Sequence, residues 1–184
     1  MTIICALHDP KENVVWLGCN DRATIGDTPA PASENKWLKF GSWAVGLTCN
    51  ECVYKQYLQL SADKFPETAE NVLEVFDFLR SRYKKYNLGQ QKGNDTSTSY
   101  GAEGIIVRDN GEIWDFDSHL ALSKVPSGRL WGGGSGIDYA LGADHIMQGD
   151  NAPAQTRIQR AVEAAIALDI GCPGEPIVER FSRS

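Results

Sequence analysis

The second residue, Thr2, is where this sequence could place a nucleophile that carries its own base. Aminopeptidase normally removes an initiator methionine that precedes a residue as small as threonine, so loss of Met1 would leave Thr2 at the N-terminus. An N-terminal threonine has a hydroxyl that attacks and an α-amine that accepts the proton. That amine has a pKa of about 8, so part of it is neutral at neutral pH. Such a site also needs a nearby cation and a donor for the oxyanion.

The residues that commonly hold metals or cofactors form no recognisable set. Cys49 and Cys52 make a C-x-x-C, but no second pair and no His-x₃₋₅-His accompanies them, so we interpret them as structural or incidental thiols. The glycine-rich run 132–136 precedes a predicted helix, but it lacks the lysine and hydroxyl of a phosphate-binding loop. The sequence therefore predicts no metal and no cofactor.

The composition is that of an acidic globular chain with free thiols. Its 184 residues suit one domain, residues 1–184, and the formal net charge of −6 argues against binding nucleic acid or an anionic membrane. The N-terminus lacks the charged region of a signal peptide, and no apolar run approaches the ~20 residues of a membrane span. Five cysteines without a secretory signal indicate a reducing compartment, so we expect a cytoplasmic protein.

The apolar pattern places blocks of strands and helices in turn, without a regular βαβ alternation. The predicted strands are 2–8, 14–19, 37–40, 43–47, 101–108, 112–116 and 176–181. The predicted helices are 50–60, a segment opening at 66–68, 137–148 and 154–168. The helix that opens at 66–68 is expected to bury Val72, Leu73, Val75, Phe76 and Leu79. This order indicates an α+β fold with two sheets and helical layers.

Short motifs run along nearly the whole chain, from about Thr2 to Phe181. They are Thr2-Ile3-Ile4, Leu17–Gly26, Lys36–Phe40, Gly134–Ala143 and Asp169–Cys172. Together they resemble the proteasome β-subunit family, including the bacterial HslV-type peptidases; the most specific match is Leu17–Gly26, which resembles the family's G-A-D-S-R-A-T-x-G. Members are N-terminal-nucleophile (Ntn) hydrolases, so the resemblance implies a four-layer αββα sandwich and hydrolysis of amide bonds.

The resemblance assigns roles to residues that are far apart in sequence. It makes Thr2 the nucleophile, with its α-amine as the base, and it makes Lys36 the cation that lowers the pKa of both groups. Ser135 and Asp169 take the auxiliary positions that orient the amine and the hydroxyl. Cys172 replaces the serine that partners the auxiliary aspartate.

The same resemblance suggests how a substrate would be held. The backbone N–H near Cys49 takes the position of the oxyanion donor, where the family usually has glycine. Leu47 and Ala23 fall near the wall of the substrate pocket, which implies an apolar or modest pocket.

Asn20 occupies the position of the family's active-site aspartate and cannot carry a charge. The neighbouring Asp21 could replace that carboxylate only if a bulge at 19–21 turned it round, because adjacent side chains in a strand point to opposite faces. Three hypotheses follow: a threonine-type endopeptidase, a catalytically silent ring or scaffold subunit, and an Ntn amidase acting on a small amide.

The expected partners also come from the resemblance. Family members stack into rings that enclose their sites, so we expect a homo-oligomeric ring acting on peptides or unfolded proteins. Because the sequence has no nucleotide-binding motif, any unfoldase ATPase would be a separate polypeptide. No nucleic-acid or membrane partner is expected.

Overall fold

The computed structural model describes residues 2–22, 24–25, 28–29, 35–48, 62–85, 90–91, 98–99, 103–119 and 121–182. In this part of the chain, the first of two larger antiparallel sheets has the order β12 (Leu130–Gly133), β1 (Ile4–Asp9), β2 (Val14–Asn20), β13 (Pro176–Phe181). The second has the order β11 (Leu122–Lys124), β10 (Ile113–Phe116), β9 (Glu103–Arg108), β6 (Trp43–Thr48), β5 (Trp37–Phe40). The helices are η1 (Ala62–Lys64), α2 (Val72–Lys85), α3 (Ile137–Gly149) and α4 (Ala154–Leu168). Two-residue strands pair as β3 (Thr24–Ile25) with β4 (Thr28–Pro29), and β7 (Gln90–Gln91) with β8 (Thr98–Ser99).

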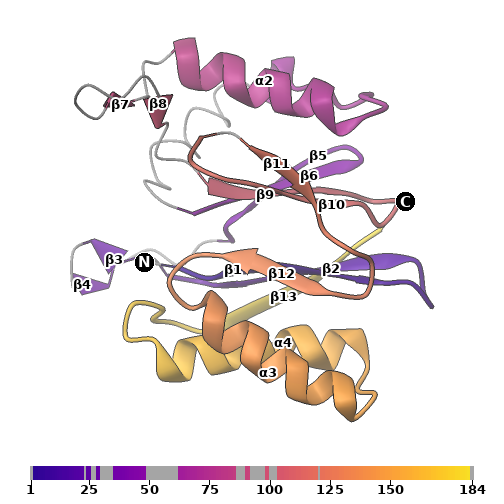
Figure 1. Ribbon diagram of the computed structural model, residues 1–184, viewed down its shortest axis with the longest axis vertical. Coiled ribbons are helices and arrows are strands. Elements are labelled where there is room, and N and C mark those ends of the chain that lie inside the picture. The colour runs from indigo at the N-terminus through magenta and orange to yellow at the C-terminus, as the bar shows by residue number, and fades with distance from the viewer. Residues whose placement is uncertain are drawn as a thin grey trace.

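The layers follow one another along the long axis of the molecule (Figure 1). The helices α3 and α4 cover the outer face of the first sheet, the two sheets face each other, and α2 lies over the second sheet. Three apolar clusters fill the spaces between these layers, and the middle one lies between the sheets. The mixed α/β architecture with two antiparallel sheets agrees with the sequence prediction.

β1 is buried on both faces because it lies inside the first sheet between two layers. Ile3, Cys5 and Leu7 pack against α3 and α4, whereas Ile4 and Ala6 pack toward the second sheet. Side chains of a strand alternate between its faces, so such a strand needs apolar residues at every position. The continuous apolar run at 2–8 has this origin.

Close packing of α4 on β2 depends on Gly18. A Cβ at this position would lie 2.9 Å from Val162 Cγ2 and 3.0 Å from Ile158 Cγ1. The glycine therefore lets the helix lie directly on the sheet.

The helix α2 begins later than the sequence predicts. The side-chain oxygen of Asn71 accepts the backbone N–H groups of Leu73 (3.0 Å) and Glu74 (3.2 Å), which caps the helix just before Val72. The preceding residues 66–71 form turns instead of a first helical turn.

The predicted apolar stripe on α2 is wrong for one residue, Leu73. Val72, Val75 and Leu79 are buried at helical spacing, and Phe76 is half-buried. Leu73 is 62% exposed because it lies off this stripe.

Most other element boundaries agree with the sequence prediction within two residues. The last helix and the last strand, 154–168 and 176–181, have the bounds that the sequence predicts. The helix predicted at 50–60 lies outside the described residues. Of the helices that the structure describes, none combines the length and apolarity that spanning a membrane requires.

Candidate active site

Thr2 lies buried at the start of β1, with two polar side chains on its hydroxyl. Its Oγ1 donates a hydrogen bond to Asn20 Oδ1, at 3.2 Å, and accepts one from Lys36 Nζ. Thr2 is 4% exposed, Lys36 is 3% exposed and Asn20 is 0% exposed. The structure thus brings together three residues that the sequence proposes for one site.

The hairpin of β1 and β2 places Asn20 beside Thr2. The antiparallel register pairs Ile4 with Cys19, so Asn20 falls opposite the residue next to Thr2. Asn20 Oδ1 accepts the backbone N–H of Ile3 at 3.0 Å, and the backbone N–H of Asn20 donates to the carbonyl oxygen of Ile3 at 3.4 Å.

Lys36 reaches Thr2 from the residue before β5. Trp37, at the start of that strand, is buried between the sheets, and its indole N–H donates to the carbonyl oxygen of Gly18 at 3.2 Å. This anchor directs the neighbouring lysine into the first sheet, where Lys36 Nζ also donates to the carbonyl oxygen of Arg22 at 2.9 Å. A protonated lysine here would favour the ionised form of the Thr2 hydroxyl.

Asn20, not Asp21, faces Thr2. The β2–β13 ladder continues through Asn20, paired with Pro176, so residues 19–21 form no bulge that would exchange the two side chains. The carboxylate of Asp21 accepts the backbone N–H of Glu175 at 2.9 Å. Gly174 makes room for it, with a φ of +105° and a position where a Cβ would lie 1.9 Å from Asp21 Oδ1.

A second polar cluster combines Ser135, Asp169 and Cys172. Ser135 Oγ and Cys172 Sγ lie 3.7 Å apart in a hydrogen bond, and the Cys172 thiol donates to Asp169 Oδ2 at 3.2 Å. The other carboxylate oxygen, Asp169 Oδ1, accepts the backbone N–H of Gly171 at 2.8 Å. Asp169 caps the C-terminus of α4, and Ser135 lies in the turn before α3.

The contacts of this cluster set the charge of its members. Burial raises the pKa of Asp169, but hydrogen bonds from Ser135, Gly171 and Cys172 more than offset it and hold that pKa below its ordinary value. Burial and then the neighbouring Asp169 raise the pKa of the Cys172 thiol to about 11. The cluster therefore holds a carboxylate and a neutral thiol at neutral pH.

Gly134 joins the two clusters. Its φ is +99°, and a Cβ there would lie 2.0 Å from the carbonyl oxygen of Thr2 and 3.1 Å from Thr2 Cγ2. The turn that carries Ser135 can approach Thr2 this closely only because residue 134 has no side chain.

The chain matches no family model and no curated protein. Solved structures do match it over almost its whole length. The BPH protein of Thiobacillus denitrificans aligns with a TM-score of 0.75 in complex with epoxomicin (15% identity, 99% of both chains). The same protein described without that ligand gives a TM-score of 0.72 at 17% identity over 100% of both chains. The eukaryotic HslV of Trypanosoma brucei aligns with a TM-score of 0.71 at 16% identity, over 98% of this chain and 99% of that chain.

The fold is HslV-like. At such low identity the likeness shows the fold alone, and the chemistry of the site has to be argued from this chain's own residues.

Of the three substrate-binding residues predicted from the sequence, the structure describes only Leu47. Cys49, the expected oxyanion donor, and Ala23 lie outside the described residues. Leu47 is 2% exposed and packs in the cluster between the second sheet and α2, so its role as a pocket wall stays a prediction.

Sequence reasoning missed two backbone groups at the site. Asn20 Nδ2 donates to the carbonyl oxygens of Arg22 and Pro173, the latter at 2.8 Å and 153 positions away. Every residue type has a backbone carbonyl, so the sequence does not indicate which carbonyls lie beside Asn20. These contacts can be identified only from the three-dimensional structure. Within the described ranges, no group of three histidine, cysteine, aspartate or glutamate side chains could hold a metal ion.

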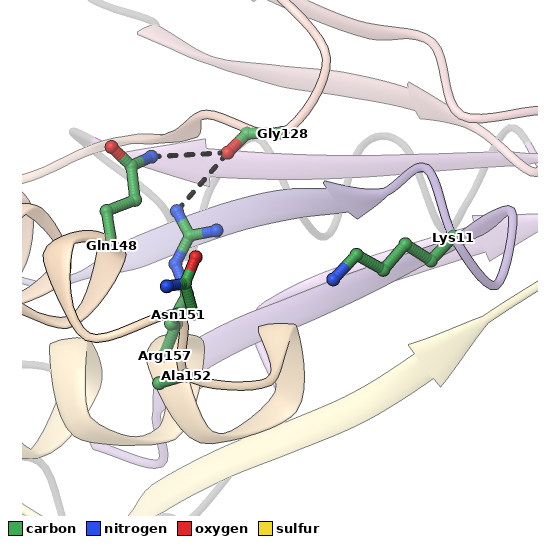
Figure 2. A pocket seen from close by; sticks show the side chains of 6 residues that line it. All are labelled: Lys11, Gly128, Gln148, Asn151, Ala152 and Arg157. Atoms are coloured by element: carbon green, nitrogen blue, oxygen red, sulfur yellow. Dashed lines mark hydrogen bonds between the residues drawn. The ribbon is translucent and has the colours of Figure 1, made fainter.

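A separate hollow of about 300 Å³ is not lined by Thr2 or by any residue of the two polar clusters (Figure 2). Its lining residues are Lys11, Gly128, Gln148, Asn151, Ala152 and Arg157. The guanidinium of Arg157 pairs with Asp144 through contacts of 2.7 and 2.9 Å and also donates to the carbonyl oxygen of Gly128. Because Asp144 neutralises that charge, we assign this hollow no ligand.

Proposed function

We propose that this chain is a threonine-type peptidase subunit of a self-compartmentalised ring protease, with Thr2 as the nucleophile after removal of Met1. The observation that carries the proposal is the hydrogen bond from Lys36 Nζ to Thr2 Oγ1 between two buried side chains. Burial of a lysine is rare without a function or a partner, and here its ammonium meets the one hydroxyl that can have its own amine as a base. The HslV-like fold supports the assignment to the four-layer αββα sandwich of the Ntn hydrolases.

The proposed reaction has two steps. The Thr2 α-amine accepts the hydroxyl proton while Oγ1 attacks the scissile carbonyl carbon, and the proton then passes to the leaving amine as the C–N bond breaks. Water next attacks the resulting ester, and Oγ1 regains a proton as the carboxylic acid leaves. Lys36 stabilises the negative charge that develops on Oγ1 as its proton leaves and again as the ester bond breaks, and the backbone N–H at Cys49 is the proposed oxyanion donor.

Asp169 and Ser135 are proposed to orient the α-amine. The lowered pKa of Asp169 keeps it charged at neutral pH, so it can attract an ammonium and fix the Ser135 hydroxyl. Cys172 holds the other side of that carboxylate through its thiol.

The ring, its location and its partners are part of the same proposal. We expect identical subunits to enclose the Thr2 sites in a cytoplasmic ring, with an unfoldase ATPase supplied by another polypeptide. The similarity to HslV-like structures supports a ring-forming oligomer. We therefore expect a ring, and its mass is the first property to measure. Analytical ultracentrifugation should give a mass of several subunits; a monomer at micromolar concentration would contradict this part.

The catalytic proposal is tested on the purified protein and on Thr2→Ala. Intact mass should show loss of Met1, and epoxomicin, the ligand of one structural neighbour, should add its mass to Thr2. Fluorogenic peptides should be cleaved by the wild type and not by Thr2→Ala. Thr68→Ala, at an exposed threonine before α2, is the matched control and should keep full activity.

The silent-subunit alternative is favoured by one observation, the neutral Asn20 next to Thr2. Full retention of Met1, or a free Thr2 that neither reacts with epoxomicin nor cleaves any peptide, would favour it over the peptidase. Turnover of small amides without turnover of peptides would point to the amidase instead.

A further inference from the structure

All four hydrogen-bonding positions of the Asn20 side chain are engaged. Its Oδ1 accepts from Ile3 N at 3.0 Å and from Thr2 Oγ1 at 3.2 Å, while its Nδ2 donates to the carbonyl oxygens of Arg22 and Pro173. A peptide N–H can only donate and a peptide carbonyl can only accept. These backbone partners therefore fix which end of the amide is oxygen and which is nitrogen.

A carboxylate does not match this environment. It offers acceptors only, so one of its oxygens would face the lone pairs of the Arg22 and Pro173 carbonyls. Residue 20 is fully buried, so the mismatch would persist away from bulk water.

The carbonyl of Arg22 also links Asn20 to Lys36. It accepts from Asn20 Nδ2 and, at 2.9 Å, from Lys36 Nζ. The amide thus contacts Thr2 directly and holds the carbonyl that helps to place the lysine.

We propose that Asn20 is a positioning residue for Thr2 and Lys36 that acts through its amide, and that a carboxylate at this position is not equivalent. The inference rests on the proposed function for its catalytic meaning. The neutral Oδ1 accepts a hydrogen bond from the Thr2 hydroxyl but cannot remove its proton, and this contact leaves an Oγ1 lone pair for Lys36. The hydroxyl then turns from Oδ1 to the α-amine, which removes the proton. Asn20 is then a working part of this site rather than a sign of lost activity.

The deciding variant is Asn20→Asp, which keeps the size and the acceptor but removes both donors. We expect kcat against a fluorogenic peptide to fall at least tenfold at pH 7.5 with little change in KM. The melting temperature should fall by about 4 °C or more, a shift that reflects the two lost donor contacts. Asn13→Asp adds the same charge at an exposed turn residue far from Thr2, and it should leave kcat within twofold.

The pH dependence tests whether the ionised form of the introduced carboxyl is disfavoured at position 20. The introduced carboxyl faces two carbonyls, so its folded pKa should lie above the ordinary value of about 4. The destabilisation relative to wild type should then grow as the pH rises from about 4 through that folded pKa, and it should be smaller at pH 5 than at pH 7.5.

Several results would overturn the inference. An Asn20→Asp protein with wild-type or higher kcat would do so, and so would one that loses activity with an unchanged melting temperature at both pH values. If the wild type with a free Thr2 shows neither turnover nor epoxomicin labelling, the proposed function fails, but the melting comparison still decides the role of the amide.

The inference can still be tested if the Asn20→Asp variant does not fold. Asn20→Ala removes all four bonds without adding a charge, so a folded Asn20→Ala beside an unfolded Asn20→Asp supports the inference. If neither variant folds, the wild type is labelled with ¹⁵N-asparagine. A side-chain NH₂ pair near the Ile3 amide that exchanges slowly with solvent supports it, and rapid exchange of that pair overturns it.

Discussion

Lys36 Nζ donates a hydrogen bond to Thr2 Oγ1, and both side chains are buried where β5 of one sheet begins and β1 of the other begins. The contact joins segments that lead into the two facing sheets. It places a positive charge on the hydroxyl that the proposed chemistry must ionise. The first prediction concerns this contact.

Lys36→Met should lower kcat/KM for peptide cleavage by about 10²–10³-fold, the range seen when one stabilising group is removed from a developing oxyanion. Epoxomicin labelling of Thr2 should slow in parallel. Lys39→Met, at an exposed lysine of the adjoining strand β5, is the control and should stay within twofold. A Lys36→Met protein that keeps more than half of the wild-type activity would show that the lysine charge is not needed.

Gly134→Ala should destabilise the fold and displace Thr2. The added Cβ would meet the Thr2 carbonyl oxygen at 2.0 Å and would sit at a φ of +99°, so we expect a loss of about 2–4 kcal/mol in the free energy of unfolding. Gly142→Ala is the matched control, since a Cβ there meets nothing within 4 Å inside α3; it should stabilise by about 0.5–1 kcal/mol. Urea unfolding measures both, and equal stabilities would contradict the packing argument.

Asp169 should make stability depend on acid pH. Its pKa lies below the ordinary value in the folded state, so its contribution is present above the unfolded pKa of about 4 and is lost as the pH falls through the folded pKa. Asp169→Asn should therefore flatten the loss of stability below about pH 4, measured by urea unfolding between pH 2.5 and pH 7. Asp77→Asn, at an exposed position of α2, removes the same charge and is the matched control. An identical acid limb in Asp169→Asn would refute this role.

Cys172 should be unreactive in the folded protein. The side chain is buried, and a thiol pKa of about 11 leaves almost no thiolate at pH 8. Peptide mass analysis after alkylation should show Cys172 modified only when urea is present. Cys172→Ser keeps a donor to Asp169 and should retain activity within about threefold, whereas Cys172→Ala removes the donor and should cost about 1 kcal/mol of stability.

Asp144→Asn should be one of the more damaging substitutions outside the Thr2 site. The pair with Arg157 is bidentate and mostly buried, with side chains 7% and 11% exposed, and its loss leaves a guanidinium unpaired. A cost of about 3 kcal/mol is expected in chemical denaturation. Glu163→Gln, which breaks the exposed i,i+3 pair with Arg160, should cost less than about 0.5 kcal/mol.

Much of the fold can be predicted from local patterns. The apolar run at 2–8 and the helical stripe of α4 each depend on neighbours only a few residues away, so their elements appear where the patterns predict them. Leu73 shows the limit of such patterns, because an apolar side chain next to the buried stripe of Val72, Val75 and Leu79 can still point into solvent.

The site is harder to predict because part of it is backbone. Motif matching proposed Thr2, Lys36 and Asn20 together, and the fold brings their side chains into contact. The carbonyl of Pro173 belongs to the same network, but any residue type can supply a carbonyl. The sequence alone identifies Asn20 only as a departure from the aspartate that the resemblance implies, whereas in the fold its amide matches the donor and acceptor groups around it.

The first sheet has a consequence for synthesis of the chain. Thr2 lies just before β1, but β1 pairs with β12, and β2 pairs with β13, the last strand that the structure describes. The Pro173 carbonyl that holds Asn20 also comes from this last part. A chain still emerging from the ribosome lacks these partners, so the contacts around Thr2 are completed only after residues 173–181 have been made. Under the proposed function, a copy that is still being made therefore lacks a complete site and is expected to be inactive until these segments have been synthesised.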